Sequence, residues 1–192
     1  MAQKKIIKKT KQNIKKKKWY SLHASKEFNN VKIGESYVEN PEQLKGKYVG
    51  TNLGFVANDP KKQGYNVTFA IIETKGDIGV GELVEYSLSS SHLKRMVRKG
   101  TGKMEDSFVV TTKDGIKYRI KPVFVTRFST HNSVKTALRK KSQEYYIESF
   151  KQINSNEVFT QIISNKLQVN LKQTLRKIYP VSVSEIKSIK KV

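Results

Sequence analysis

Short segments in which apolar and polar residues alternate fill the middle of the chain, as in half-buried β-strands. Turn signals such as Asn40-Pro41 and Lys75-Gly76-Asp77 separate these segments. The pattern predicts strands over residues 33–39, 48–52, 65–73 and 81–87. Several strands at this spacing predict an antiparallel sheet that curls towards a barrel.

The clearest local prediction is a β-hairpin over residues 107–128. Phe108 and Val110 occupy alternate positions, Asp114-Gly115 suits a tight turn, and Tyr118 continues the alternation on the second strand. Pro122 has no N–H group to donate to a sheet, so we expect it at an edge or a bulge.

The segment SSSHLKRMVRKG, residues 89–100, predicts one short basic helix. Its serines suit the helix start, and Gly100 suits a left-handed stop. One apolar face would hold Leu93, Met96 and Val97. The cations would form like-charged pairs one turn apart, Lys94 with Arg98 and Arg95 with Lys99. Because such pairs destabilise a helix, we interpret this face as a phosphate contact, with an ordinary solvated basic face as the alternative.

From residue 132 onward the hydrophobic period becomes helical. The first helix is predicted to bury Val134, Leu138, Tyr145, Ser149 and Ile153. A second apolar stripe, expected to pack in the core, contains Leu167, Leu171, Leu175 and Ile178. Pro180 ends this helix, and a final strand follows. The predicted fold class is α+β: an antiparallel, barrel-like sheet, then C-terminal helices and a last strand, behind a disordered basic N-terminal arm.

The net charge of the chain limits the kinds of partner that it is expected to bind. The 192 residues carry a formal net charge of +22, and residues 1–18 hold nine lysines and no acid. So large an excess fits a polyanionic partner, above all nucleic acid, and we expect the arm to order on phosphates. A nuclear-import signal would look similar, and a membrane-surface helix is disfavoured because the apolar face is thin. Without cysteine, a signal peptide or a bilayer-length apolar run, the chain is expected to be soluble and intracellular, with no membrane partner.

These patterns divide the chain into three parts. They are a basic RNA-binding arm over residues 1–18, a mainly antiparallel β body with one short basic helix over residues 19–128, and a helical part ending in a strand over residues 129–192.

No catalytic or metal-binding constellation is evident. His23, His92 and His131 lie far apart without a ligand spacing. The segment GVGELV, residues 79–84, has no following helix and is interpreted as a hairpin or bulge. The segment KGTGKM, residues 99–104, lacks the first glycine and the hydroxyl residue of a phosphate loop. We therefore predict no enzyme activity, no cofactor and no metal.

The predicted RNA contacts lie in the arm, the short helix and the start of the long helix, and Trp19 is the best candidate for stacking on a base. They are Lys4, Lys5, Lys8, Lys9, Lys11, Lys15, Lys16, Lys17, Lys18, Trp19, Lys94, Arg95, Arg98, Lys99, Lys103, Lys135, Arg139, Lys140 and Lys141.

Several stretches together resemble the archaeal and eukaryotic small-subunit ribosomal protein family called S-three-Ae, also written eS-one. The matching stretches are KKKWY at residues 16–20, NPEQLKGKYVGTNL at 40–53, LKRMVRKGTGKMEDSFVVTTKDGIKYRI at 93–120, RKK at 139–141 and KIYPVSVSEIKSIKKV at 177–192. The segment RFSTHNSVK, residues 127–135, is less basic than is usual in that family.

The resemblance implies a structural protein of the cytoplasmic ribosome, on the small-subunit platform near the mRNA exit. Its implied partners are small-subunit rRNA including the 3′ region and neighbouring platform proteins, with mRNA near the exit as a further candidate. Two other functions stay open on the residues alone: a nucleic-acid chaperone or DNA-compacting protein outside the ribosome, and an RNA-modifying enzyme.

Overall fold

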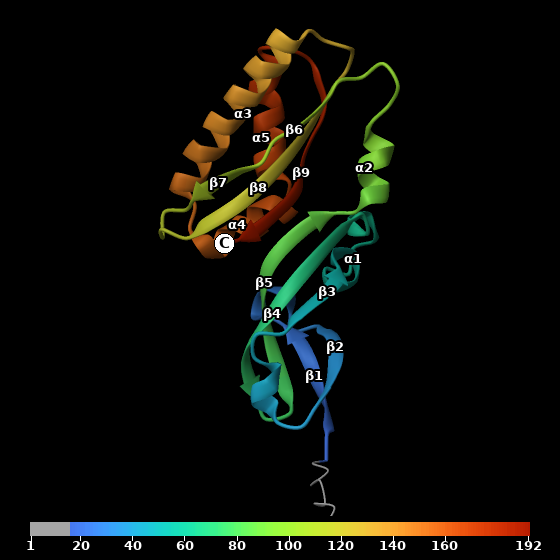
Figure 1. Cartoon of the computed structure of the whole chain (residues 1–192), viewed down its shortest axis with the longest axis vertical. Coiled ribbons are helices and arrows are strands. Elements are labelled where there is room, and N and C mark those ends of the chain that lie inside the picture. The colour runs from blue at the N-terminus through green and yellow to red at the C-terminus, as the bar shows by residue number, and fades with distance from the viewer. Residues whose placement is uncertain (1–15) are drawn as a thin grey trace, which may run out of the picture.

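The computed structural model describes residues 16–192 of the chain, which form strands, α-helices and short 3₁₀ turns (Figure 1). The strands are β1 Lys18–Ala24, β2 Lys32–Val38, β3 Tyr48–Asn52, β4 Tyr65–Lys75, β5 Ile78–Leu88, β6 Lys103–Glu105, β7 Phe108–Thr111, β8 Lys117–Thr126 and β9 Val181–Lys191. The α-helices are α1 Leu53–Val56, α2 Ser90–Met96, α3 Asn132–Gln152, α4 Ser155–Ile163 and α5 Lys166–Arg176. The 3₁₀ turns are η1 Lys26–Phe28, η2 Pro41–Leu44 and η3 Pro60–Lys62.

Within residues 16–192, nine strands make one continuous mixed sheet. Its main path runs β2-β1-β5-β9-β8-β6, with β4 joined to β5, β3 joined to β4, and β7 joined to β8. The molecule is elongated, with β1 to β5 in the lower half of Figure 1 and β6 to β9 with α3, α4 and α5 in the upper half. The two halves share the ladder between β5 and β9, from Glu85↔Lys190 to Ser87↔Ser188.

The predicted α+β class is confirmed, but the barrel-like, purely antiparallel sheet is wrong in two respects. The sheet is not closed, although its edges β2 and β3 approach where Lys47 Nζ donates to Ser36 Oγ at 3.1 Å. In addition, β1 pairs with β5 in parallel. The sheet stays open because β5 pairs with β1 through Ile78–Gly81 and then with β9 through Glu85–Ser87, so the ladder continues into the upper half.

The four predicted strands are confirmed. The predicted segments 33–39, 48–52, 65–73 and 81–87 coincide with β2, β3, β4 and β5 to within a few residues at each end. The predicted hairpin is β7 and β8, and its Gly115 has a φ of +78°. Pro122 lies in an inner strand, where the β8–β9 register shifts between Lys121 and Pro122, so it marks a bulge. The glycines of GVGELV lie in β5 opposite a second bulge, in β4.

Helices α3, α4 and α5 pack on the upper part of the sheet, and aromatic rings set the buried face of α3. On α3 the buried residues are Leu138, Ser142, Tyr146 and Phe150. The predicted face is confirmed at Leu138 and at Ile153, which follows the helix, but Tyr145 and Ser149 are only half-buried, so the helix is rotated from the predicted face. The rings decide the rotation of the helix, because the Phe150 ring centroid lies 6.4 Å from those of Tyr118 and Tyr146. On α5, the predicted stripe is buried at Leu167, Leu171 and Leu175, whereas Ile178 follows the helix end and is exposed.

None of the described helices combines the length and the apolar character needed to cross a membrane.

Candidate nucleic-acid interface

The lower end of the molecule carries the last lysines of the basic arm. Lys16, Lys17 and Lys18 are exposed and lead directly into β1. Trp19, the next residue, is 66% exposed. The other arm contacts predicted from the sequence lie outside the described residues: Lys4, Lys5, Lys8, Lys9, Lys11 and Lys15.

The short basic helix begins as predicted but ends early. Ser89 is its N-cap and accepts a hydrogen bond from the His92 N–H at 3.3 Å. The helix ends at Met96, because Val97 is extended and the following residues form a turn in which Thr101 Oγ1 donates to the Arg98 carbonyl at 2.6 Å. Gly100, with a φ of +83°, belongs to this turn and does not stop the helix. The predicted like-charged pairs one helical turn apart are therefore wrong, because Arg98 and Lys99 lie beyond the helix.

The segment after α2 is anchored to the end of β8. The Thr126 N–H donates to the Gly102 carbonyl at 2.9 Å, and the Gly102 N–H donates to Thr126 Oγ1 at 3.0 Å. A Cβ atom on Gly102 would lie 3.6 Å from Lys135 Cε, at the start of α3. The fold thus brings Gly102, the end of the segment that carries Arg98 and Lys99, beside Lys135.

Three of the predicted RNA contacts form ion pairs with carboxylates of the same chain. Lys103 pairs with Glu105 at 2.7 Å, Arg139 with Asp106 at 3.4 Å and Lys141 with Glu144 at 3.0 Å. The Lys103 hydrogen bond, with help from Lys187, holds the pKa of Glu105 below its usual value. Burial raises the pKa of Asp106 against the opposing effect of Arg139. These three cations share their charge with neighbouring acids.

The remaining predicted cations among residues 16–192 are not ion-paired with a carboxylate. Within residues 16–192, no carboxylate lies within 4.0 Å of the charged groups of Lys16, Lys17, Lys18, Lys94, Arg95, Arg98, Lys99, Lys135 or Lys140. All of them except the half-buried Lys135 are exposed. Unpaired cations of this kind are available to phosphates.

A basic hollow of about 480 Å³ was not predicted from the sequence. Arg127, Lys172 and Arg176 line it together with Pro180, Val181 and Ser182. The three cations converge because Thr126 pairs with Val181 and the Arg127 N–H donates to the Pro180 carbonyl at 3.0 Å. We define the upper basic region as Arg98, Lys99, Arg127, Lys135, Lys172 and Arg176. Lys172 and Arg176 lie one turn apart on α5, but Arg127 reaches them only through the β8–β9 ladder, so spacing along the chain does not indicate the hollow.

Comparison with known proteins identifies the family. The Ribosomal S3Ae family matches residues 5–192. The chain belongs to this family. A relative from Nanoarchaeum equitans, named small ribosomal subunit protein eS1, is 32% identical over 166 residues, which are 86% of this chain and 84% of the relative. Relatives with the same name from Saccharolobus islandicus and Saccharolobus solfataricus are each 30% identical over 176 residues, 92% of this chain and 85% of theirs.

Membership of the S3Ae family confirms the resemblance proposed from the sequence. The RNA contacts themselves stay predictions, since the structure shows where these residues lie but not what they bind. Across residues 16–192, no cluster of three or more histidine, aspartate or glutamate side chains is arranged to hold a metal ion.

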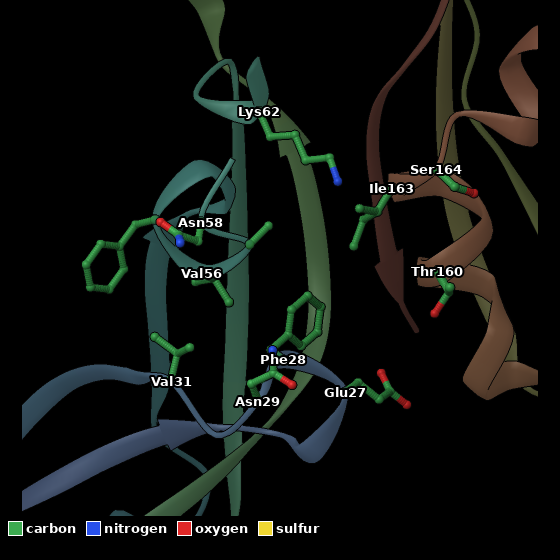
Figure 2. Close-up of a pocket in the computed structure, with 12 residues that line it drawn as sticks. Glu27, Phe28, Asn29, Val31, Val56, Asn58, Lys62, Thr160, Ile163 and Ser164 are labelled. Carbon is green, nitrogen blue, oxygen red and sulfur yellow. The ribbon is translucent and has the colours of Figure 1, made fainter. Parts of the chain in front are cut away.

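A second hollow, of about 700 Å³, lies between the lower half of the sheet and α4 (Figure 2). Phe28, Val56 and Ile163 contribute apolar side chains to its wall. Glu27 and Lys62 are the only ionisable residues that line it. This lining lacks the paired titratable groups that acid–base catalysis requires.

Proposed function

We propose that this chain is a structural protein of the small ribosomal subunit that binds ribosomal RNA through basic surfaces at both ends of the molecule. One observation carries the proposal: cations without a carboxylate partner gather at the two ends of a chain whose relatives are named small ribosomal subunit proteins. The lower contact is the basic arm with Lys16–Lys18, and the upper contact is the upper basic region with Lys94, Arg95 and Lys140.

Binding through these surfaces rests on phosphate contacts. Each cation that neutralises a phosphate releases a condensed counterion, and this release drives association at physiological salt. Such contacts position a protein on RNA without reading its sequence. The sheet that joins the two ends fixes the distance between the lower and upper contacts, so the chain is suited to hold separate RNA helices in a fixed arrangement.

The proposed location follows from the family resemblance. It is the platform of the small subunit in the cytoplasmic ribosome, near the mRNA exit and the 3′ region of the rRNA. Neighbouring platform proteins, and mRNA near the exit, are the other proposed partners. The role is structural and not catalytic, and the division after residues 18 and 128 is retained as part of the proposal.

The test compares unpaired with paired cations. The double variant Arg95→Ala/Arg98→Ala is expected to bind small-subunit rRNA more weakly and to lower the slope of log K against log salt by roughly two, about one per phosphate contact. The control, Lys62→Ala/Lys75→Ala, removes the same charge from lysines paired with Asp59 and Glu73 at 3.9 and 3.8 Å. Its slope should stay close to that of the parent chain. Equal slopes for both double variants would reject the assignment of α2 and its following turn.

Competition and sedimentation separate the rival functions. A nucleic-acid chaperone or DNA-compacting protein should bind duplex DNA as well as rRNA and should leave small subunits at high salt. The proposed ribosomal protein should prefer folded rRNA and remain with small subunits during high-salt sedimentation. RNA modification that persists in ribosome-free fractions would instead support an enzyme.

A further inference from the structure

Two aromatic rings lie side by side on the outer face of the β1–β2 ladder. Trp19 of β1 is directly opposite Tyr37 of β2, and their ring centroids are 5.1 Å apart with an interplanar angle of 39°. The strand alternation turns Tyr20 and Val38, the next residue on each strand, into the core. Tyr37 was not among the contacts predicted from the sequence, because its partner is on another strand.

Both rings are open to solvent although the lower core lies directly behind them. Trp19 is 66% and Tyr37 is 52% exposed. Large aromatic rings bury much apolar area when they are covered, so an exposed pair is typical of a binding surface. Because β2 is an edge strand of the described sheet, no described strand pairs along its outer edge.

The charge beside the rings favours a polyanion over a protein segment. Lys16, Lys17 and Lys18 precede Trp19 without an acid between them, and Lys18 is opposite Val38 in the same ladder. Two carboxylates lie along this side of the ladder: Glu35, which is ion-paired with Lys32, and Glu39, which directly follows β2. The surface therefore combines flat aromatic faces with unpaired positive charge, the two features that bind single-stranded nucleic acid.

We propose that Trp19 and Tyr37 form a stacking site for unpaired RNA bases, while Lys16–Lys18 hold the adjoining phosphates. The inference rests on the proposed function and adds a class of ligand, because duplex bases are stacked within their own helix and cannot cover these rings. Stacking is tolerant of sequence, so the site is expected to select unpaired RNA and no particular base.

Intrinsic fluorescence tests the site directly, because Trp19 is the only tryptophan in the chain. The full chain is titrated with a single-stranded oligouridylate and, separately, with an RNA duplex that has the same number of phosphates. The single strand is expected to quench Trp19 emission on binding. The duplex is expected to bind through its phosphates with little quenching.

Variants assign the effect to the ring pair. Tyr37→Ala should lower the affinity for oligouridylate by about tenfold, the loss of one base stack, and leave duplex affinity unchanged. Tyr37→Phe should retain the parent affinity, because it keeps an aromatic face. The matched control is Phe55→Ala, which removes a ring of similar exposure, 62%, from α1.

The outcomes separate this inference from the proposed function. Equal quenching by duplex and single strand, or unchanged oligouridylate affinity in Tyr37→Ala, would overturn the stacking site and leave phosphate binding intact. Quenching by RNA-free small-subunit proteins but not by oligouridylate would assign the rings to a protein partner and would also overturn it. Failure to bind either RNA at physiological salt would contradict the proposed function itself.

Discussion

Burial of one carboxyl group, that of Glu185, makes the stability of the folded chain depend on pH. Glu185 lies in β9, and its Oε2 atom is buried without a hydrogen-bond partner. Burial raises the pKa of Glu185 to about 7, against the opposing effects of a hydrogen bond from Tyr65 and the positive charge of Lys172. Burial of Tyr65, together with the neighbouring Glu185, raises the pKa of Tyr65 to about 12. A charged Glu185 is therefore unfavourable in the folded chain.

This residue predicts a pH-dependent stability. The folded pKa is above the unfolded value of 4.5, so the folded chain retains a proton that the unfolded chain releases between about pH 4.5 and 7. Stability from this group is thus present at low pH and is lost as pH rises through that window. Glu185→Gln should raise the free energy of unfolding by up to about 3 kcal/mol at pH 8 and by little at pH 4.5.

Urea unfolding of the parent chain and Glu185→Gln across this pH range provides the measurement. Glu157→Gln, which removes an exposed carboxylate from the first turn of α4, is the matched control. A difference between Glu185→Gln and the parent that is constant with pH would contradict the assignment.

At the scale of residues, the sequence revealed the basic side chains but not their partners. Lys103, Arg139 and Lys141 were predicted as RNA contacts, yet each is paired with a carboxylate. The Asp106 partner of Arg139 lies 33 positions away along the chain, beyond the reach of local pattern. The convergence of Arg127 with Lys172 and Arg176 could not be predicted either, because Arg127 lies far from them along the chain.

At the scale of elements, prediction succeeded where the deciding contacts are local. The β7–β8 hairpin follows from alternation and one Asp-Gly turn, and the stripe of α5 from its leucines. Strand β6 was missed because it has only three residues and pairs with β8, and the parallel pairing of β1 with β5 was missed because the two strands lie far apart in the sequence. The rotation of α3 was mispredicted because Tyr146 and Phe150 are chosen by rings on other elements, such as Phe108 and Tyr118.

The anchor between β8 and the segment after α2 gives a prediction for this connection. A Cβ atom on Gly102 would lie 2.8 Å from Thr126 Oγ1, too close for the hydrogen bonds that join the two segments. Gly102→Ala should lower the free energy of unfolding by about 1–3 kcal/mol, the usual cost of overpacking. It should also weaken rRNA binding, because this anchor holds the segment that carries Arg98 and Lys99.

Thermal unfolding and rRNA titration of the same variant measure the two effects. Gly50→Ala is the matched control, since an added Cβ atom there meets nothing within 4 Å. If Gly102→Ala unfolds and binds like the control, the anchor does not position the upper basic region.

At the scale of the whole molecule, the fold separates two basic ends along one continuous sheet. The lower end carries Lys16–Lys18 and the Trp19–Tyr37 pair, and the upper end carries the upper basic region (Figure 1). A formal net charge of +22 is self-repelling, and within residues 16–192 no carboxylate lies within 4.0 Å of the charged groups of Lys16–Lys18, Arg98 or Lys99. In the proposed assembly, RNA supplies the missing negative charge.

Lysine acetylation footprinting, read by mass spectrometry, tests that claim most directly. The free chain and the chain within intact small subunits are compared residue by residue. The account predicts that Lys16, Lys17, Lys18, Lys94, Lys99 and Lys135 lose reactivity in the subunit, as do the lysines of residues 1–15. The paired Lys62 and Lys75 should stay reactive. Protection that is absent, or that falls equally on paired and unpaired lysines, would contradict the account.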